Sequence, residues 1–461
     1  MEKAFMGTNK RRTRAQDPLL AEIERELGLG RFIRYGDMFD FVAGLEQVEQ
    51  KLATLVSGGN AERAVGLYEA FLAGCYEKIE ECDDSGGYLG MFWDDLFCGW
   101  VKARQAAGRP SSETVQQILK WQERDDYGFC YDIEKDVAKV LNPEAYEALV
   151  AHYRKTVENG LAGLSGQKPC AIFEYDNSIR LPAMTLKEMY RARGDIASYA
   201  AVCERIGLSP KDCEHLAEME KAKRRWKQAL AWIEKGLELE ATRNWHNEAA
   251  FSLSHMKPEI LSHLGRKEDA LAQAWSEFQE HPTEMGYEEF MRYVPKAESK
   301  KWHEQAMEAA KAGGIGSFMD ICVKTKEWTR LADRVHAATH EELAGVSHYH
   351  SEAAAAKLVK RDDAAAAKLY RAMGFRILNA KKSKYYENAL ANFENARDLY
   401  RKAGLESEWA ALVETVRAEH ARKYGFMPGF EKITSGGSAE GPSFAERARA
   451  RWARQMGTGG S

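Results

Sequence analysis

Two segments near the middle of the chain repeat one amphipathic helical pattern, and neither could bury its apolar side alone. Both place apolar residues at intervals of three and four, which is typical of a helix with one buried side. The members of the two segments are Trp226, Ala229, Leu230, Ile233 and Leu237, and then Ala270, Leu271, Ala274, Trp275 and Phe278. Ala229 and Ala270 are 41 positions apart, within the range of helical-hairpin repeats. Such repeats bury a continuous core only by stacking, so the sequence predicts an all-α solenoid of antiparallel, degenerate hairpins.

Breaks in the helical pattern, together with charge, divide the chain into six predicted parts. Residues 163–182 are the one stretch without a clear helical pattern, and residues 434–442 are rich in glycine and serine, which is typical of a flexible linker. We expect a basic disordered N-terminus at 1–17, an N-terminal helical unit at 18–162, a hinge at 163–182, a helical-repeat array at 183–433, the linker at 434–442 and a basic amphipathic tail helix at 443–461.

Composition places the chain among ordinary soluble proteins. It has 461 residues, 44% of them hydrophobic and 30% charged, with a net charge of -4, which argues against general polyanion binding by the whole surface. The eight cysteines form no Cys-x-x-Cys or Cys-x-Cys pair, and no apolar run reaches the length of a signal peptide core or a membrane span. We therefore expect a cytoplasmic protein with reduced thiols, no transmembrane segment and no cofactor.

Four segments carry a resemblance to a known group of proteins. They are Asp-Asp-Ser-Gly-Gly at 83–87, the Asp-Asp-Tyr-Gly turn at 125–128, the helix at 229–237 and the closing helix at 409–423. In order and pattern, residues 60–433 resemble the helical region of bacterial SWIM zinc-finger proteins and a related standalone bacterial family of unknown function. The zinc-binding Cys-x-Cys with its downstream Cys-x-His is absent here. The resemblance implies a tetratricopeptide-like array and little about activity.

An acidic loop is the first candidate for a metal site. Asp83 and Asp84 precede Ser85 and two glycines, and carboxylates and hydroxyls suit calcium or magnesium. The spacing does not match an EF-hand loop. We favour the alternative that Asp84 or Ser85 caps the next helix while the glycines turn the chain.

A group of histidines is the second candidate. Four of the twelve histidines fall within fifteen residues, namely His336, His340, His348 and His350. His336 and His340 have the i, i+4 spacing that would put both rings on one side of a single helix, so all four could converge on zinc or a similar metal. No His-Glu-x-x-His motif is present, and packing or surface roles are the favoured interpretation. A metal-dependent enzyme at this cluster or at the acidic loop remains one alternative function.

Aromatic and basic residues supply the candidate partner-binding positions. Most of the tryptophans should fill the helical core, but Trp245, beside His246 and Asn247, could line a groove that binds a peptide. In the tail, Phe444 and Trp452 lie near one side of a predicted helix surrounded by Arg447, Arg449, Arg451 and Arg454. Such a helix could dock on an acidic groove, a partner, nucleic acid or an anionic membrane surface. The alternative is a disordered, solubilising tail.

The leading functional prediction is a non-enzymatic protein-interaction scaffold whose acidic helical-repeat surface binds a basic or extended protein or peptide. The sequence contains no motif for a nucleophile elbow or a phosphate-binding loop. It does contain the repeated amphipathic pattern from which stacked helices build a long surface. The body of the chain is acidic while both ends are basic, so the chain's own tail is one possible occupant of that surface. A further alternative is an accessory nucleic-acid-binding protein that uses the basic termini, with Lys10, Arg11, Arg12 and Arg14 at the N-terminal end.

Overall fold

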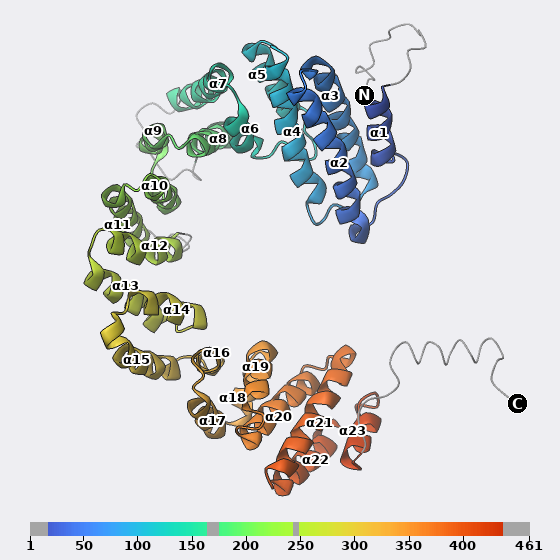
Figure 1. The fold of residues 1–461 in the computed structure, drawn as a ribbon, viewed down its shortest axis with the longest axis vertical. Helices are drawn as coiled ribbons and strands as arrows, with labels where there is room; N and C mark the ends of the chain where they lie inside the picture. Colours follow the sequence, from blue (N-terminus) through green and yellow to red (C-terminus); the bar gives the residue numbers. More distant parts are fainter. Residues whose placement is uncertain (1–16, 164–174, 243–248, 437–461) are drawn as a thin grey trace, which may run out of the picture. The chain divides into compact units, whose positions relative to one another are not determined.

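The computed structural model describes residues 17–163, 175–242 and 249–436, and these are almost entirely helical (Figure 1). Within these ranges the only strand-like pairing is an isolated parallel β-bridge between Ile33 and Cys82. Successive helices pack against one another as hairpins. The predicted all-α class of helical hairpins is confirmed.

The chain forms two compact units, which we call unit 1 (Met1–Leu253) and unit 2 (Ser254–Ser461). The predicted division at 163–182 is therefore wrong for the described part of that segment. Helix α7 (Pro143–Ala162) and helix α8 (Asn177–Arg193) belong to one core, and a Cβ built on Gly160 would lie 2.4 Å from Cγ1 of Ile179. Pro182 lies inside α8 and does not end it. Residues 164–174 lie outside the described ranges.

The described helices of unit 1 pack around large aromatic side chains, including fully buried Trp93 and Trp100. Besides α7 and α8, they are α1 (Pro18–Leu27), α2 (Met38–Ser57), α3 (Ala61–Lys78), α4 (Tyr88–Ala106), α5 (Ser111–Glu123), α6 (Ile133–Val140), α9 (Ile196–Ile206), α10 (Pro210–Ala222) and α11 (Trp226–Thr242). Helix α12 (Ala250–His263) begins in unit 1 and ends in unit 2. Capping residues determine where several helices begin. Asn142 caps α7, whose first residue is Pro143, and Ser209 and Asp212 form a capping box at the start of α10.

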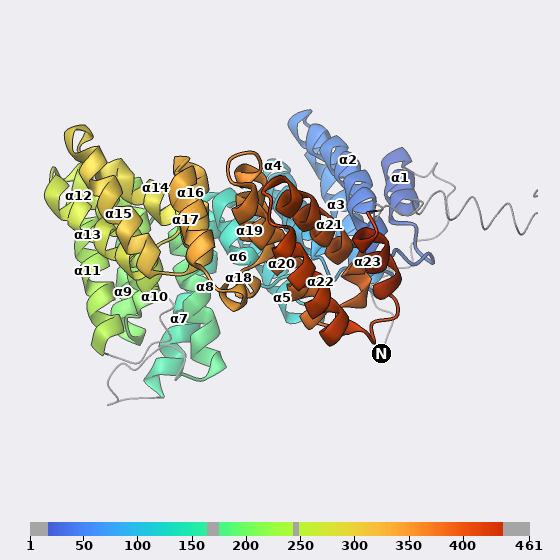
Figure 2. The ribbon, with the colours of Figure 1, turned by 90° about the horizontal axis from the view of Figure 1, so that it is seen from below.

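Unit 2 continues the hairpins with shorter helices followed by longer ones. The described helices are α13 (Lys267–Glu280), α14 (Glu284–Tyr293), α15 (Ser299–Ala312), α16 (Ile315–Thr325), α17 (Trp328–Ala337), α18 (His340–Gly345), α19 (His348–Leu358), α20 (Asp363–Asn379), α21 (Tyr386–Lys402), α22 (Glu406–His420) and α23 (Met427–Thr434). Figures 1 and 2 show α20 to α23 packed side by side. Gly374 makes this close approach possible, because a Cβ there would lie 2.7 Å from the ring of Phe393.

The two segments with matching patterns are helices α11 and α13, as predicted. In α11 the buried residues include Ala229, Leu230 and Ile233, and α11 packs mainly on α10. In α13 they are Ala270, Ala274 and Phe278, and α13 packs on α14 and α15. The small residues face neighbouring helices in both cases, so the pattern correctly identified the buried sides.

Candidate partner-binding surface

The acidic loop caps a helix. The carboxylate of Asp84 accepts hydrogen bonds from the backbone N–H of Leu89 at 3.0 Å and of Gly90 at 3.2 Å, in the first turn of α4. The carboxylate of Asp83 accepts a 2.6 Å hydrogen bond from the hydroxyl of Ser85. The capping role is therefore confirmed for Asp84. Across the described ranges, no group of three or more His, Cys, Asp or Glu side chains is arranged to hold a metal ion.

The expectation that His336 and His340 share one helix is wrong. Helix α17 ends at Ala337, Ala338 is extended with ψ 143°, and Thr339 caps the new helix α18 through a capping box with Glu342. A capping box satisfies two backbone N–H groups at a helix start, which favours a new helix over continuation of the old one.

The four histidines also have separate partners. His336 Nε2 lies 2.9 Å from the carboxylate of Asp362, which caps α20, and His350 Nδ1 lies 2.6 Å from the carboxylate of Asp320 on α16. The ring of His340 meets Phe375 edge to face at 4.9 Å, and the ring of His348 lies 3.9 Å from that of Tyr349. Because each ring packs against a different partner, the predicted metal site at His336, His340, His348 and His350 does not form.

The remaining predicted binding residues lie outside the described ranges. They are Trp245, the tail residues Arg447, Arg449, Arg451, Trp452 and Arg454, and the N-terminal residues Lys10, Arg11, Arg12 and Arg14.

The described part of unit 1 exposes an apolar cluster that the sequence did not single out. We call Tyr35, Phe39, Tyr88 and Met91 the aromatic surface. Phe39 is 66% exposed and Met91 is 60% exposed, although both are large and apolar. The rings of Phe39 and Tyr88 meet edge to face at 6.4 Å, and the rings of Tyr35 and Tyr88 both lie against Gly86. A contiguous exposed cluster of this kind is typical of an interaction site.

A buried lysine holds this end of unit 1 in place. The ammonium of Lys78 is fully buried and donates to the carbonyl oxygens of Gly28 and Arg31 and to the carboxylate of Glu81 at 3.1 Å. The backbone of Ile33 pairs with the segment after α3, donating to the carbonyl of Glu81 at 2.8 Å. These contacts fix residues 28–33 against the end of α3. The segment that carries Tyr35 is therefore anchored, so the aromatic surface is prepared before any partner binds.

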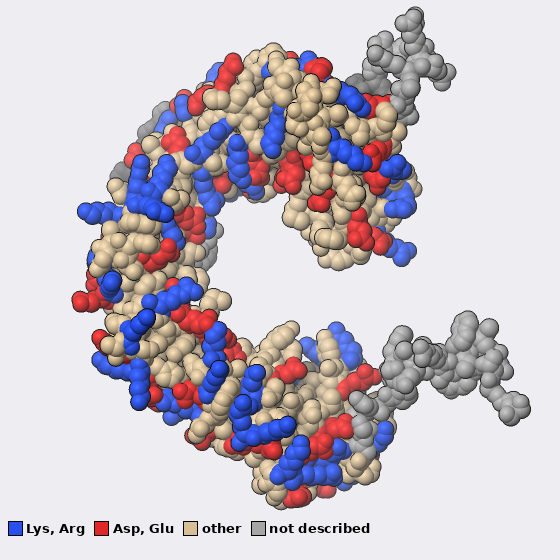
Figure 3. All heavy atoms as spheres, in the orientation of Figure 1, with Lys and Arg blue, Asp and Glu red and all other residues tan. Residues whose placement is uncertain are grey.

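Carboxylates are frequent in the segments that carry the aromatic surface. Residues 77–95 carry seven Asp and Glu side chains and one basic residue, Lys78, which is buried. Asp37 and Asp40 add exposed carboxylates on either side of Phe39, while Arg31 and Arg34 precede them in the chain. Figure 3 shows uncharged surface with both acidic and basic side chains beside it over this end of α2 to α4. A negative border favours a partner segment of positive charge.

One partly buried carboxyl group of α4 lies near several other carboxylates. Burial, together with the nearby Asp136, Asp95 and Asp132, raises the pKa of Asp94 to about 6, although Lys135 opposes the shift. Like charges close together disfavour ionisation. Burial and the nearby carboxylates therefore both oppose the ionisation of Asp94.

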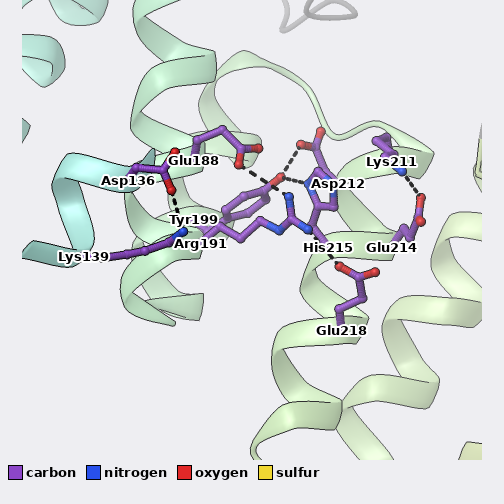
Figure 4. Close-up of polar contacts among 10 residues, drawn as sticks. All are labelled: Asp136, Lys139, Glu188, Arg191, Tyr199, Lys211, Asp212, Glu214, His215 and Glu218. Atoms are coloured by element: carbon purple, nitrogen blue, oxygen red, sulfur yellow. Dashed lines mark hydrogen bonds and ion pairs between the residues drawn. The ribbon is translucent and has the colours of Figure 1, made fainter. Parts of the chain in front are cut away.

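A second polar cluster joins α8, α9 and α10 inside unit 1 (Figure 4). The hydroxyl of Tyr199 donates to the carboxylate of Asp212 and lies 3.0 Å from Nδ1 of His215. The ammonium of Lys187 on α8 lies 2.7 Å from the same carboxylate, with both side chains buried. Burial, with a smaller contribution from nearby cations, lowers the pKa of His215 to about 4, so its ring is neutral at pH 7. Because these groups bond to one another, the cluster stabilises the hairpin and offers no open site.

The comparison with family models identifies the chain's relatives. The model described as a family of unknown function, DUF6880, matches residues 20–428. The chain belongs to this DUF6880 family. No curated protein matches it.

Solved structures with similar chains include two natural proteins and a circular tandem repeat protein. One is a chain of Naa15/Naa10 bound to HypK-THB, at 13% identity and TM-score 0.31, covering 88% of this chain and 64% of that chain, slightly under two thirds of its length. Yeast Tom70 matches at 10% identity with a TM-score of 0.22, and the match covers 88% of this chain and 98% of that chain. The circular tandem repeat protein matches at 14% identity with a TM-score of 0.18, and the match likewise covers 88% of this chain and 98% of that chain. These scores are low, so the functional argument rests on this chain's own residues. None of the described helices is long and apolar enough to cross a membrane.

Proposed function

We propose that this protein is a non-enzymatic protein-interaction scaffold. Its aromatic surface would bind a basic segment of a partner protein that also carries apolar side chains. The observation that carries the proposal is the anchored cluster of Tyr35, Phe39, Tyr88 and Met91 with carboxylates beside it. Exposed aromatic residues supply contact energy at interfaces, and the surrounding charges select the partner and speed its approach.

The helical hairpins support this role because they hold a surface rigidly without a catalytic group. We also propose that the likeness to the helical region of SWIM zinc-finger proteins, which rests on the sequence alone, reflects the same use of helical hairpins as a scaffold. A cytoplasmic location fits the proposed role and follows from the sequence expectations alone.

A synthetic peptide with the sequence of residues 443–456 tests the partner chemistry directly, because it combines Phe444 and Trp452 with four arginines. We expect it to bind the full chain in isothermal titration calorimetry. Phe39→Ser or Met91→Ser should each weaken binding about tenfold, since truncating a central contact in an interface commonly costs more than about 1 kcal/mol. A peptide with glutamine in place of its arginines should bind more weakly, and the difference should shrink at high salt.

Tyr131→Ser is the matched control, because Tyr131 is an exposed tyrosine of unit 1 outside the aromatic surface. It should leave the affinity unchanged. Equal losses for Tyr131→Ser and Phe39→Ser, or binding that does not depend on the arginines, would contradict the proposal.

A further inference from the structure

One end of the α20–α23 helices in unit 2 is basic. Two loops meet there, one between α20 and α21 with the sequence Ala-Lys-Lys-Ser-Lys-Tyr-Tyr at 380–386, and one after α22 with Ala-Arg-Lys-Tyr at 421–424. We call the cations of these loops, together with their tyrosines, the basic end. Its members are Lys381, Lys382, Lys384, Arg422 and Lys423, and Tyr385, Tyr386 and Tyr424.

Packing of aromatic rings brings the two loops together. The ammonium of Lys423 lies 5.9 Å from the centre of the Tyr386 ring, and that ring lies 5.6 Å from the ring of Phe426. Lys384 approaches the ring of Tyr385 at 4.8 Å. Phe426 is fully buried, so the loop after α22 is held against the start of α21. Figure 3 shows basic side chains gathered over the junction of α20 and α21.

The cations of the basic end form no ion pair with a described carboxylate. Within the described ranges, none of the five lies within 4.0 Å of an Asp or Glu side chain as an ion pair. Other cations of the same helices do have such partners: Arg397 lies 2.8 Å from Asp398, and Arg417 lies 2.7 Å from Glu431. The charge of the basic end is therefore available to an anion from outside.

The tyrosines of the basic end provide flat aromatic rings in the same loops as the cations. Tyr424 is 82% exposed and Tyr385 is 42% exposed, whereas Tyr386 is largely buried between the loops. An exposed aromatic ring beside unpaired lysines combines the two contacts by which proteins bind single-stranded nucleic acid, namely stacking on bases and attraction of the phosphate backbone.

We propose that the basic end of unit 2 binds single-stranded nucleic acid. The lysines and Arg422 contact successive phosphates, and Tyr424 and Tyr385 stack on unpaired bases. A duplex offers few free base faces, so the tyrosines favour a single strand over a duplex. An acidic peptide would use the cations and leave the tyrosine rings without a matching partner. The proposal concerns residues of unit 2 other than those of the aromatic surface and of the basic termini.

Fluorescence anisotropy with a labelled oligothymidylate of about 15 nucleotides tests this on the full chain. Lys382→Ala/Lys384→Ala/Arg422→Ala should reduce the slope of log Kd against log salt by about 2, since each phosphate contact on a single strand contributes roughly 0.7. Lys381 is left in place so that the variant changes no residue with a positive φ, which is 54° here. Tyr424→Ala should weaken binding about tenfold at every salt concentration and leave the slope unchanged, because stacking releases no counterions.

The matched controls remove the same groups elsewhere. Lys296→Ala/Lys300→Ala/Lys311→Ala removes three exposed cations of unit 2, and Tyr131→Ala removes an exposed tyrosine of unit 1. Both should bind as the unchanged chain does.

Three results would overturn the proposal. The first is no binding of the oligonucleotide at low salt. The second is equal losses for the basic-end variants and their controls, or no loss at all, which would place binding elsewhere, including the basic termini. The third is a loss with the triple variant but none with Tyr424→Ala, together with equal competition by polyglutamate, which would indicate an acidic peptide instead.

Discussion

Replacing Asp212 with alanine should open the α8–α10 region of unit 1. The carboxylate of Asp212 accepts from four groups: the ammonium of Lys187 at 2.7 Å, the hydroxyl of Tyr199 at 3.0 Å, and the backbone N–H and hydroxyl of Ser209 at 2.9 and 2.6 Å. Burial by itself would raise the pKa of this carboxyl, but Lys187 and Ser209 outweigh it and lower the pKa. The carboxylate is thus charged and bonded, and its loss leaves a buried cation without a partner.

The magnitude follows from that unpaired cation. Removing one member of a buried ion pair costs about 3–5 kcal/mol, and losing the helix cap adds about 1 kcal/mol. In the double variant Lys187→Met/Asp212→Ala no unpaired charge remains, so the destabilisation should fall to about 1–3 kcal/mol. Because a depressed carboxyl pKa stabilises the fold above the ordinary pKa of aspartate, the contribution is present at pH 7 and is lost as the pH falls through the lowered folded pKa.

Hydrogen exchange measured by mass spectrometry is the appropriate assay, since a long array of hairpins does not unfold in one step. Asp212→Ala should accelerate exchange of the protected amides of α8, α9 and α10 by about 100-fold or more at pH 7, and the double variant should recover a large part of their protection. Equal protection in the single and double variants would refute the reasoning, because the energy would then not come from the unpaired Lys187.

Two further changes test other parts of the structure. Asp94→Asn should raise the opening free energy of the protected amides of α4 at pH 7 by about 1–2 kcal/mol in hydrogen-exchange measurements, because burial and neighbouring carboxylates raise the pKa of Asp94 to about 6 and ionisation above that pH opposes folding. The variant should also lose the gain in stability that the unchanged chain shows as the pH falls from 7 towards 5, and an unaltered pH profile would argue against the shift. Gly374→Ala should lower the unfolding free energy of unit 2 by about 1–3 kcal/mol, since the new methyl group would lie 2.7 Å from the ring of Phe393. Gly90→Ala, at a helical position with nothing within 4 Å, should instead stabilise by about 0.5–1 kcal/mol, and a similar loss in both variants would contradict the packing argument.

The helical pattern was sufficient to predict the hairpins but not the boundary between the units. Helices α11 and α13 were readable because their small and large apolar residues repeat with helical spacing. The division at Leu253 falls inside α12, which continues through Pro258 without a break, so no end of a helix marks the boundary. The predicted hinge, by contrast, rested partly on Pro182, which α8 accommodates because its side chains on either side, Ile179 and Leu186, are buried in the core.

The candidate sites were less predictable because exposure depends on packing between distant segments. The break between His336 and His340 could have been read from Thr339 and Glu342, which have the spacing of a capping box. The aromatic surface left a weaker signal: Phe39 lies outside the stripe of buried residues in α2 that includes Val42 and Leu45. Large aromatic residues usually belong to the core, so the sequence alone gave no reason to place these side chains at the surface.

Site-specific photocrosslinking in the native cell tests the scaffold proposal most directly. A photoreactive phenylalanine analogue at position 39 of the full chain should form a covalent adduct with one partner protein, through a segment of net positive charge. Met91→Ser in the same chain should reduce the yield severalfold, and the same analogue at position 131 should give no adduct with that partner. Absence of an adduct at position 39, an equal yield at position 131, or a crosslinked segment of net negative charge would contradict the proposal.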